Sequence, residues 1–235
     1  SMKVVVPENG QAGAFNAYSS FDANPLYVAV FGFRFVSGVF SGTSSPIIHM
    51  RSASNVTQNV AGFAIKNVGG TNYFFFQWSD YLGEHEENTG VVVGAGNVYS
   101  LQVGCKWSDV NVANGYAKGW INGILVAQKT GIKHYTSGFD GICGQDVGVW
   151  LQGGARDVTA YFDDCVMHND YIATNPFADG GPYLFAGGFE NIDRGPAWEV
   201  ATDASCHPDG LGYRARLAAL PIDPIGPVGC PRVTG

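Results

Sequence analysis

Short runs of strand-forming residues, separated by glycine, asparagine and serine, recur along most of this chain. Residues 26–36 are apolar on both alternating faces, which is typical of a strand covered on both sides. Residues 98–107 alternate more cleanly, with Tyr99, Leu101, Val103, Cys105 and Trp107 on one face. That alternation predicts a half-buried strand.

The clearest turn signal is Asn122-Gly123, which is flanked by apolar residues on both sides. Both positions of this pair tolerate a positive φ, so the segment predicts a hairpin with a type I′ turn. Further strands are expected over residues 47–51, 62–66, 73–78, 142–151 and 158–167. Only residues 201–220 leave room for a short helix. Many short strands without intervening helices predict an all-β fold, a sandwich of two antiparallel sheets.

Composition changes near residue 180, where proline becomes frequent. Seven of the 11 prolines lie between residues 182 and 231, and proline cannot donate a hydrogen bond to a sheet ladder. We therefore expect an N-terminal arm over residues 1–19, a sandwich over 20–180 and an irregular Pro/Gly-rich extension over 181–235. The extension keeps several apolar residues and is expected to pack on the sandwich or on a neighbouring subunit. Ser1 before Met2 resembles a tag remnant, so the natural start is expected at Met2.

Charge is scarce in this sequence. Only 14% of residues are charged, and 13 basic against 20 acidic residues give a net charge of −7. Nucleic-acid binding and electrostatic attachment to an anionic membrane both need clustered basic residues, so neither is expected. The chain is 46% hydrophobic, which argues against disorder.

The five cysteines stand at positions 105, 143, 165, 206 and 230. None forms a Cys-x-x-Cys pair, so a structural zinc site is not expected. Two interpretations remain open: Cys206 could pair with Cys230, or all five could be buried thiols that act as small hydrophobic residues.

Two motifs resemble the concanavalin A-like, laminin-G-like jelly rolls. The first is the WING sequence at residues 120–123, and the second is YFDDCV at residues 161–166. The residues that follow, MHND at 167–170 and GGP at 180–182, are similar to those of laminin-G-like proteins in tailed bacteriophage particles. The resemblance implies a lectin-like jelly roll over residues 20–172, and this fold hosts lectins, glycan-cleaving enzymes and structural proteins alike.

Residues 78–87 hold the densest cluster of chemically useful side chains, and we expect them to form a loop after a strand. Aromatic faces can stack on sugars and carboxylates can bind sugar hydroxyl groups. The candidate ligand-binding residues are Trp78, Asp80, Tyr81, Glu84, His85 and Glu86. The alternatives are a solvated acidic loop with Trp78 in the core, or a catalytic pair of carboxylates.

The patterns of the enzymes with this fold are not matched. The glycoside hydrolases usually carry a Glu-x-Asp-x-x-Glu strand, and the lyases an Arg, a Gln-x-His triplet and a Tyr-rich strand. Neither Glu-x-Asp-x-x-Glu nor Gln-x-His occurs here, so lyase activity is disfavoured and no catalytic residue is assigned.

Asp163 and Asp164 are the candidate metal ligands. Related jelly rolls often hold a structural calcium near the last strand, and calcium prefers oxygen ligands. Adjacent residues of a strand point to opposite faces, so at most one side chain would reach a given site. The alternative is an aspartate that anchors a loop through hydrogen bonds, and no other cofactor is expected.

These observations favour a non-enzymatic structural or recognition module on a bacteriophage virion, such as a capsid decoration, head fibre or tail component. Its expected partners are copies of itself or capsid and tail proteins, with glycans as a further ligand. The alternative is a secreted, extracellular carbohydrate-binding module or glycan-cleaving enzyme, either a glycoside hydrolase or a polysaccharide lyase.

Overall fold

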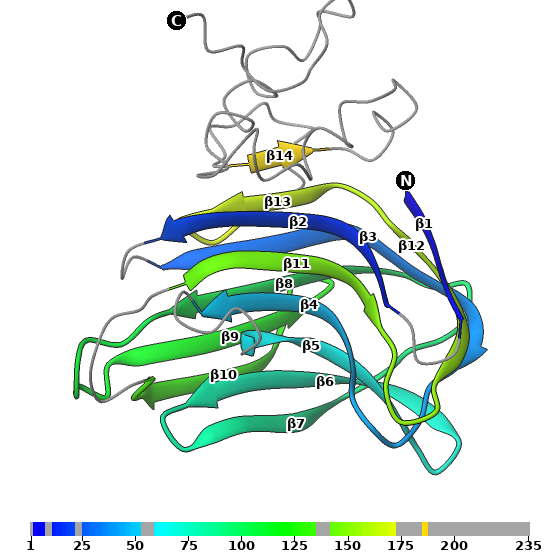
Figure 1. Cartoon of the computed structure of the whole chain (residues 1–235), viewed down its shortest axis with the longest axis horizontal. Coiled ribbons are helices and arrows are strands. Elements are labelled where there is room, and N and C mark those ends of the chain that lie inside the picture. Colours follow the sequence, from blue (N-terminus) through cyan, green and yellow to red (C-terminus); the bar gives the residue numbers. More distant parts are fainter. Residues whose placement is uncertain are drawn as a thin grey trace, which may run out of the picture.

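The computed structural model describes residues 2–7, 11–21, 25–52, 59–134, 142–172 and 185–187 of the 235-residue chain. These residues form two antiparallel sheets that pack face to face (Figure 1). The fold class predicted from the sequence, an all-β jelly-roll sandwich, is confirmed. The described part contains no helix of the length and apolarity needed to cross a membrane.

The first sheet has eight strands. Their order is β1 (Met2–Val6), β12 (Arg156–Phe162), β3 (Leu26–Val39), β8 (Val98–Lys106), β9 (Gly115–Ile121) and β10 (Ile124–Ile132). Beside this path, β13 (Cys165–His168) pairs with β3 and with β14 (Phe185–Gly187).

The second sheet has six strands. Their order is β2 (Gln11–Phe21), β11 (Ile142–Trp150), β4 (Ser45–Ser52), β5 (Asn59–Val68), β6 (Thr71–Asp80) and β7 (Gly83–Val92). The chain passes repeatedly from one sheet to the other, so strands far apart in sequence become neighbours. The expected N-terminal arm contains β1 and most of β2, which pair with β12 and β11.

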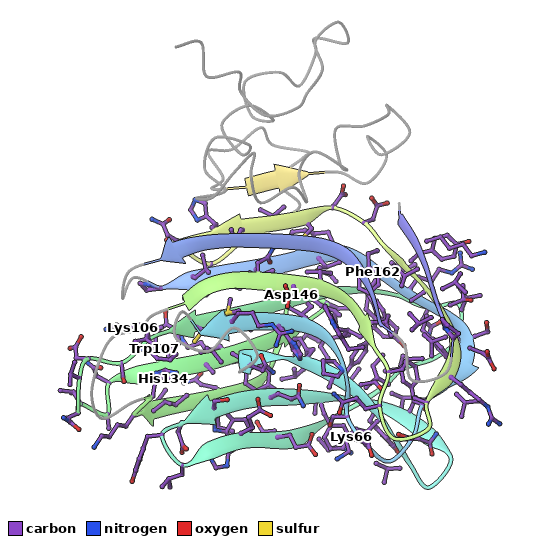
Figure 2. The ribbon with its side chains drawn as sticks, viewed as in Figure 1. Lys66, Lys106, Trp107, His134, Asp146 and Phe162 are labelled. Atoms are coloured by element: carbon purple, nitrogen blue, oxygen red, sulfur yellow. The ribbon has the colours of Figure 1, made fainter. Side chains whose placement is uncertain are left out.

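The hydrophobic core lies between the two sheets. Phe33 of β3 has no exposed surface, and its ring centroid lies 5.2 Å from that of Phe162 in the same sheet. It also lies 5.9 Å from the ring of Phe74 in the opposite sheet, and Figure 2 labels Phe162 among these packed side chains. Strand β3 is buried on both faces only over its first five residues and then alternates. The prediction that residues 26–36 are covered on both sides therefore holds for the first part of the strand.

Two local expectations need correction. Residues 78–87, which were expected to form a loop, comprise the end of β6, a turn at Tyr81 and Leu82 and the start of the edge strand β7. The sequence of this strand has no apolar alternation, because charged residues stand on both of its faces. Charge is a usual protection for an exposed sheet edge. Residues 158–167 belong to two strands rather than one. The extended conformation is interrupted at Asp163 and Asp164, where Asp164 adopts a φ of 46°.

Cys105 and Cys165 are buried free thiols, and burial raises the pKa of both. The proposed pairing of Cys206 with Cys230 and the short helix considered for residues 201–220 lie outside the described residues.

The predicted hairpin between β9 and β10 is confirmed. Asn122 and Gly123 have φ values of 53° and 76°, as a type I′ turn requires. The Asn122 backbone N–H donates to the Ser100 carbonyl at 2.7 Å, and the Ser100 N–H donates to the Asn122 side-chain oxygen at 2.9 Å. The turn is thereby tied to the neighbouring strand β8.

Replacing Asn122 with alanine is expected to lower the free energy of unfolding by about 1–2 kcal/mol. Alanine tolerates the left-handed conformation poorly and cannot accept the hydrogen bond from Ser100. Urea-induced unfolding would measure the change, with Gln128→Ala on the exposed side of β10 as the control. Equal stability of the two variants would contradict the role given to this turn.

Candidate functional site in the six-stranded sheet

A cleft of about 640 Å³ lies on the face of the six-stranded sheet that points away from the core. Its chemically distinctive lining residues are His49, Arg51, Lys66, Gln77, Glu86 and Trp150. They come from β4, β5, β6, β7 and β11, so the cleft crosses most of the sheet. Figure 2 labels Asp146 and Lys66, which mark β11 and β5 on this sheet.

Strand register places five residues in one row across the sheet. Asp146 of β11 pairs with His49 of β4, which pairs with Gly62 of β5. Gly62 pairs in turn with Gln77 of β6, and Gln77 with Glu86 of β7. Residues paired in this way share one face of a sheet, so the row brings an imidazole, an amide and two carboxylates to the same surface.

Gly62 leaves the middle of this row without a side chain. A Cβ atom at this position would lie 2.1 Å from the carbonyl oxygen of Ile48, so a larger residue would force the strands apart. The Asn59 amide nitrogen would lie 3.2 Å from the same Cβ atom, so the side chain of Asn59 occupies part of the space beside Gly62.

The His49 ring lies flat against Trp150, with 5.2 Å between ring centroids and 14° between their planes. The side chain is 7% exposed, and neither ring nitrogen has a hydrogen-bond partner. Burial, and then the nearby charge of Arg51, lower the pKa of His49 to about 3. The imidazole is therefore neutral at ordinary pH and offers an unshared lone pair.

Arg51 and Asn59 also line the cleft, and each donates a side-chain hydrogen bond to a neighbouring residue. The Arg51 Nε donates to the Asp146 carboxylate at 2.5 Å, and this pair is almost fully buried. The Asn59 amide nitrogen donates to the Gln77 side-chain oxygen at 3.2 Å. This contact fixes the orientation of Gln77, whose amide also hydrogen-bonds the Glu86 carboxylate.

Glu86 forms an ion pair with Lys66 and accepts a hydrogen bond from Ser44. Partial burial raises the pKa of Glu86, but the hydrogen bonds from Lys66 and Ser44 outweigh it and hold that pKa below its usual value. Glu86 is therefore ionised in the free protein. An ionised carboxylate can hold Lys66 in place but cannot act as a proton donor.

The residues singled out in segment 78–87 do not form one cluster. Glu84 and Glu86 line the cleft, and the Glu84 carboxylate accepts the Asn59 backbone N–H at 3.3 Å. Trp78 packs against the hydrophobic core, on the opposite face of β6 from Gln77.

The remaining members of that segment lie around Trp78 and the following turn. His85 borders the cleft, but its ring stacks on Trp78 at 5.5 Å, and its Nε2 lies 3.1 Å from the Asp80 carboxylate. Tyr81 is half exposed, with the Lys133 ammonium 5.0 Å from its ring centroid. Strand alternation divides the segment, because β6 and β7 present different side chains to their two faces.

Sequence reasoning missed His49, Arg51, Lys66 and Gln77. Strand alternation along residues 47–51 places His49 and Arg51 on the same face, and this alternation is the sequence feature that could have identified them. The Gln-x-His triplet of the lyases lies within one strand, whereas here the glutamine comes from β6, the histidine comes from β4, and the register of β5 places them in one row.

Asp163 and Asp164 lie at the break between β12 and β13. The Asp163 carboxylate accepts the Asp164 N–H at 3.1 Å, and the Asp164 carbonyl accepts the Phe31 N–H at 3.1 Å. Within the described ranges, no group of three His, Cys, Asp or Glu side chains is arranged to hold a metal ion. Calcium binding at this position stays a prediction.

No family model matches this sequence, and comparison with curated proteins gives no match. Among solved structures, the chain is similar to an endo-β-1,4-glucuronan lyase from the fungus Trichoderma reesei, with a TM-score of 0.53 and 13% identity over 74% of this chain and 83% of that one. It is also similar to the alginate lyase Aly36B in complex with an alginate trisaccharide (TM-score 0.50, 16% identity, 70% and 80% covered). A third similar structure is the alginate lyase vAL-1 from a Chlorella virus (TM-score 0.50, 13% identity, 70% and 83% covered).

The chain shares its fold with these polysaccharide lyases. This finding corrects the interpretation as a non-enzymatic bacteriophage virion protein, because the similar structures are glucuronan and alginate lyases. The resemblance to phage laminin-G-like proteins is likewise not supported. The alternative reading, a glycan-cleaving enzyme, agrees better with the comparisons.

Proposed function

We propose that this protein cleaves a polysaccharide containing uronic acids by β-elimination, with the cleft of the six-stranded sheet as its active site. The observation that carries the proposal is the neutral, unpartnered His49 beside Arg51, in one cross-strand row with Gln77. The shared fold with glucuronan and alginate lyases supports the same reaction class.

Elimination from a uronate begins with removal of the proton at C5, next to the sugar carboxylate. The negative charge that develops spreads onto that carboxylate, so donors aimed at it lower the barrier. Arg51 and the Gln77 amide are assigned to bind the carboxylate. The negative charge of that carboxylate offsets the charge of Arg51 and raises the basicity of the His49 imidazole, which then accepts the C5 proton. The electron pair of the C5–H bond forms a C4–C5 double bond as the C4–O bond breaks, and the departing oxygen takes up a proton.

Catalysis is tested by incubating the protein with glucuronan, alginate, polygalacturonate and a neutral glucan. Elimination produces both new reducing ends and the ultraviolet absorbance of the new double bond. We expect both signals with at least one polyuronate and neither with the neutral glucan. Reducing ends without absorbance would indicate hydrolysis by Glu84 and Glu86, and that result, or no cleavage of any polyuronate, would overturn the proposal.

Replacing Glu86 with glutamine is expected to tighten oligouronate binding about fivefold. Glu86 places one negative charge in the cleft and occupies Lys66, and at a partly exposed site the loss of one such repulsion is worth about 1 kcal/mol. Calorimetric titration at low salt would measure it. The matched control is Glu87→Gln, because Glu87 lies on the other face of β7, where it binds Lys129 at 2.7 Å.

If the protein were a hydrolase that used the Glu86 carboxylate for catalysis, the Glu86→Gln variant would lose cleavage activity. Weaker oligouronate binding by this variant would contradict the charge assignment of the cleft.

A further inference from the structure

The eight-stranded sheet carries a second pocket, on its solvent-facing side and therefore across the sandwich from the cleft. It has a volume of about 380 Å³. Its walls come from Trp120 of β9, Gln102 of β8, Phe31 of β3, Tyr171 after β13 and the Asn122 turn. Nothing in the proposed elimination uses these residues.

Gln102 is the unusual member of this pocket. The side chain is only 5% exposed, yet its amide nitrogen has no hydrogen-bond partner. A buried donor without a partner loses its hydrogen bonds to water and gains none in the protein, so such groups are rare unless a ligand or water satisfies them. Gln102 lines the pocket, and its buried amide nitrogen calls for an acceptor, such as a hydroxyl group.

Aromatic rings form one wall. The Trp120 ring is partly exposed, and its centroid lies 5.0 Å from that of Tyr171 and 6.1 Å from that of Tyr27. Gly104 makes this packing possible, because a Cβ atom there would lie 2.4 Å from the Tyr27 ring and 3.2 Å from Trp120. A partly exposed indole of this kind can offer part of its flat apolar surface to a ligand.

The pocket and the cleft also differ in the charge of their lining residues. No charged side chain lines it within the described residues, whereas the cleft contains Arg51, Lys66 and Glu86. The polar groups are neutral amides and a hydroxyl, from Gln102, Asn122 and Ser100. Such a lining favours an uncharged ligand that combines an apolar face with several hydroxyl groups.

We propose that this pocket is a second carbohydrate-binding site, specific for a neutral pyranose unit. One face of the sugar ring packs on Trp120, and Gln102 donates its free amide N–H to a sugar hydroxyl, with Ser100 and Asn122 at the rim. This site is independent of the elimination proposed for the cleft. It would hold the protein on a mixed or neutral glycan while the cleft acts on uronates.

The test is calorimetric titration of the full chain with uncharged gluco-, manno- and xylo-oligosaccharides and with an oligouronate. We expect at least one neutral oligosaccharide to bind. Gln102→Leu should weaken it about tenfold and Trp120→Ala more, while Gln128→Leu on exposed β10 leaves it unchanged. Arg51→Ala should weaken the binding of the oligouronate and leave the binding of the neutral oligosaccharide unchanged. The two sites can therefore be tested independently.

Far-ultraviolet circular dichroism and urea unfolding would establish that each variant is folded. If Trp120→Ala does not fold, Gln102→Leu and Tyr171→Ala decide the question, because neither removes a core side chain of the sandwich. The proposal is overturned if no neutral oligosaccharide binds at millimolar concentration. Binding that survives Gln102→Leu and the aromatic variants, or an oligouronate that competes equally for this pocket, would also overturn it.

Discussion

Replacing His49 with alanine is expected to lower the rate of uronate cleavage by about 10²–10⁴-fold, the usual contribution of a positioned general base. The imidazole is neutral, it has no competing hydrogen-bond partner, and its orientation is fixed by stacking on Trp150. Initial rates of double-bond formation at saturating polyuronate would measure the loss. Binding should change much less than the rate, because Arg51 and Gln77 remain.

The matched control is His168→Ala. His168 lies on β13 of the other sheet, where its ring accepts the Asp170 N–H at 3.0 Å, so its loss should leave the cleavage rate unchanged. If His49→Ala retains the full rate on a polyuronate that the wild-type protein cleaves, His49 is not the base.

Acidification from about pH 7 to about pH 4 is expected to destabilise the protein by roughly 3 kcal/mol through His49 alone. The pKa of this imidazole is about 3 in the folded state and 6.5 when unperturbed. Below pH 6.5 the imidazole of the unfolded chain takes up a proton, whereas that of the folded protein stays neutral. The free energy of unfolding therefore decreases as the pH is lowered, and it continues to decrease down to about pH 3. The interval from pH 6.5, the unperturbed pKa, to pH 4 covers about 2.5 pH units. Each unit corresponds to about 1.4 kcal/mol of stability.

Urea unfolding of the wild type and of His49→Phe at several pH values would isolate this contribution. Phenylalanine keeps the ring on Trp150 but cannot titrate, so the variant should lose less stability on acidification. His134 contributes in the same direction to both proteins, because burial lowers its pKa to about 4. It stacks on Trp107 at 4.4 Å, and Figure 2 labels this pair. Parallel pH profiles for the wild type and the variant would contradict the burial argument for His49.

Strand alternation and the Asn122-Gly123 turn were enough to predict the class of fold. Each of these signals depends on neighbours in sequence, and the structure confirms strands at the runs around residues 26–36, 98–107 and 142–151. The same reasoning missed β7, because its charged residues give no apolar period. It also treated residues 78–87 as one site, although both faces of β6 carry aromatic residues and the sequence does not say which of them meets solvent.

The sequence by itself therefore determined an all-β sandwich and its turns, since backbone conformation and burial period are local properties. Only the tertiary structure decided where the functional groups meet. His49, Gly62 and Gln77 stand 13 and 15 residues apart, and they share a row because the bulged pairing of β4 with β5 and the regular pairing of β5 with β6 set that register. A shift of one residue in either pairing would turn the imidazole or the amide to the other face. Register depends on the packing of the whole sheet against the core, which no single run of residues contains.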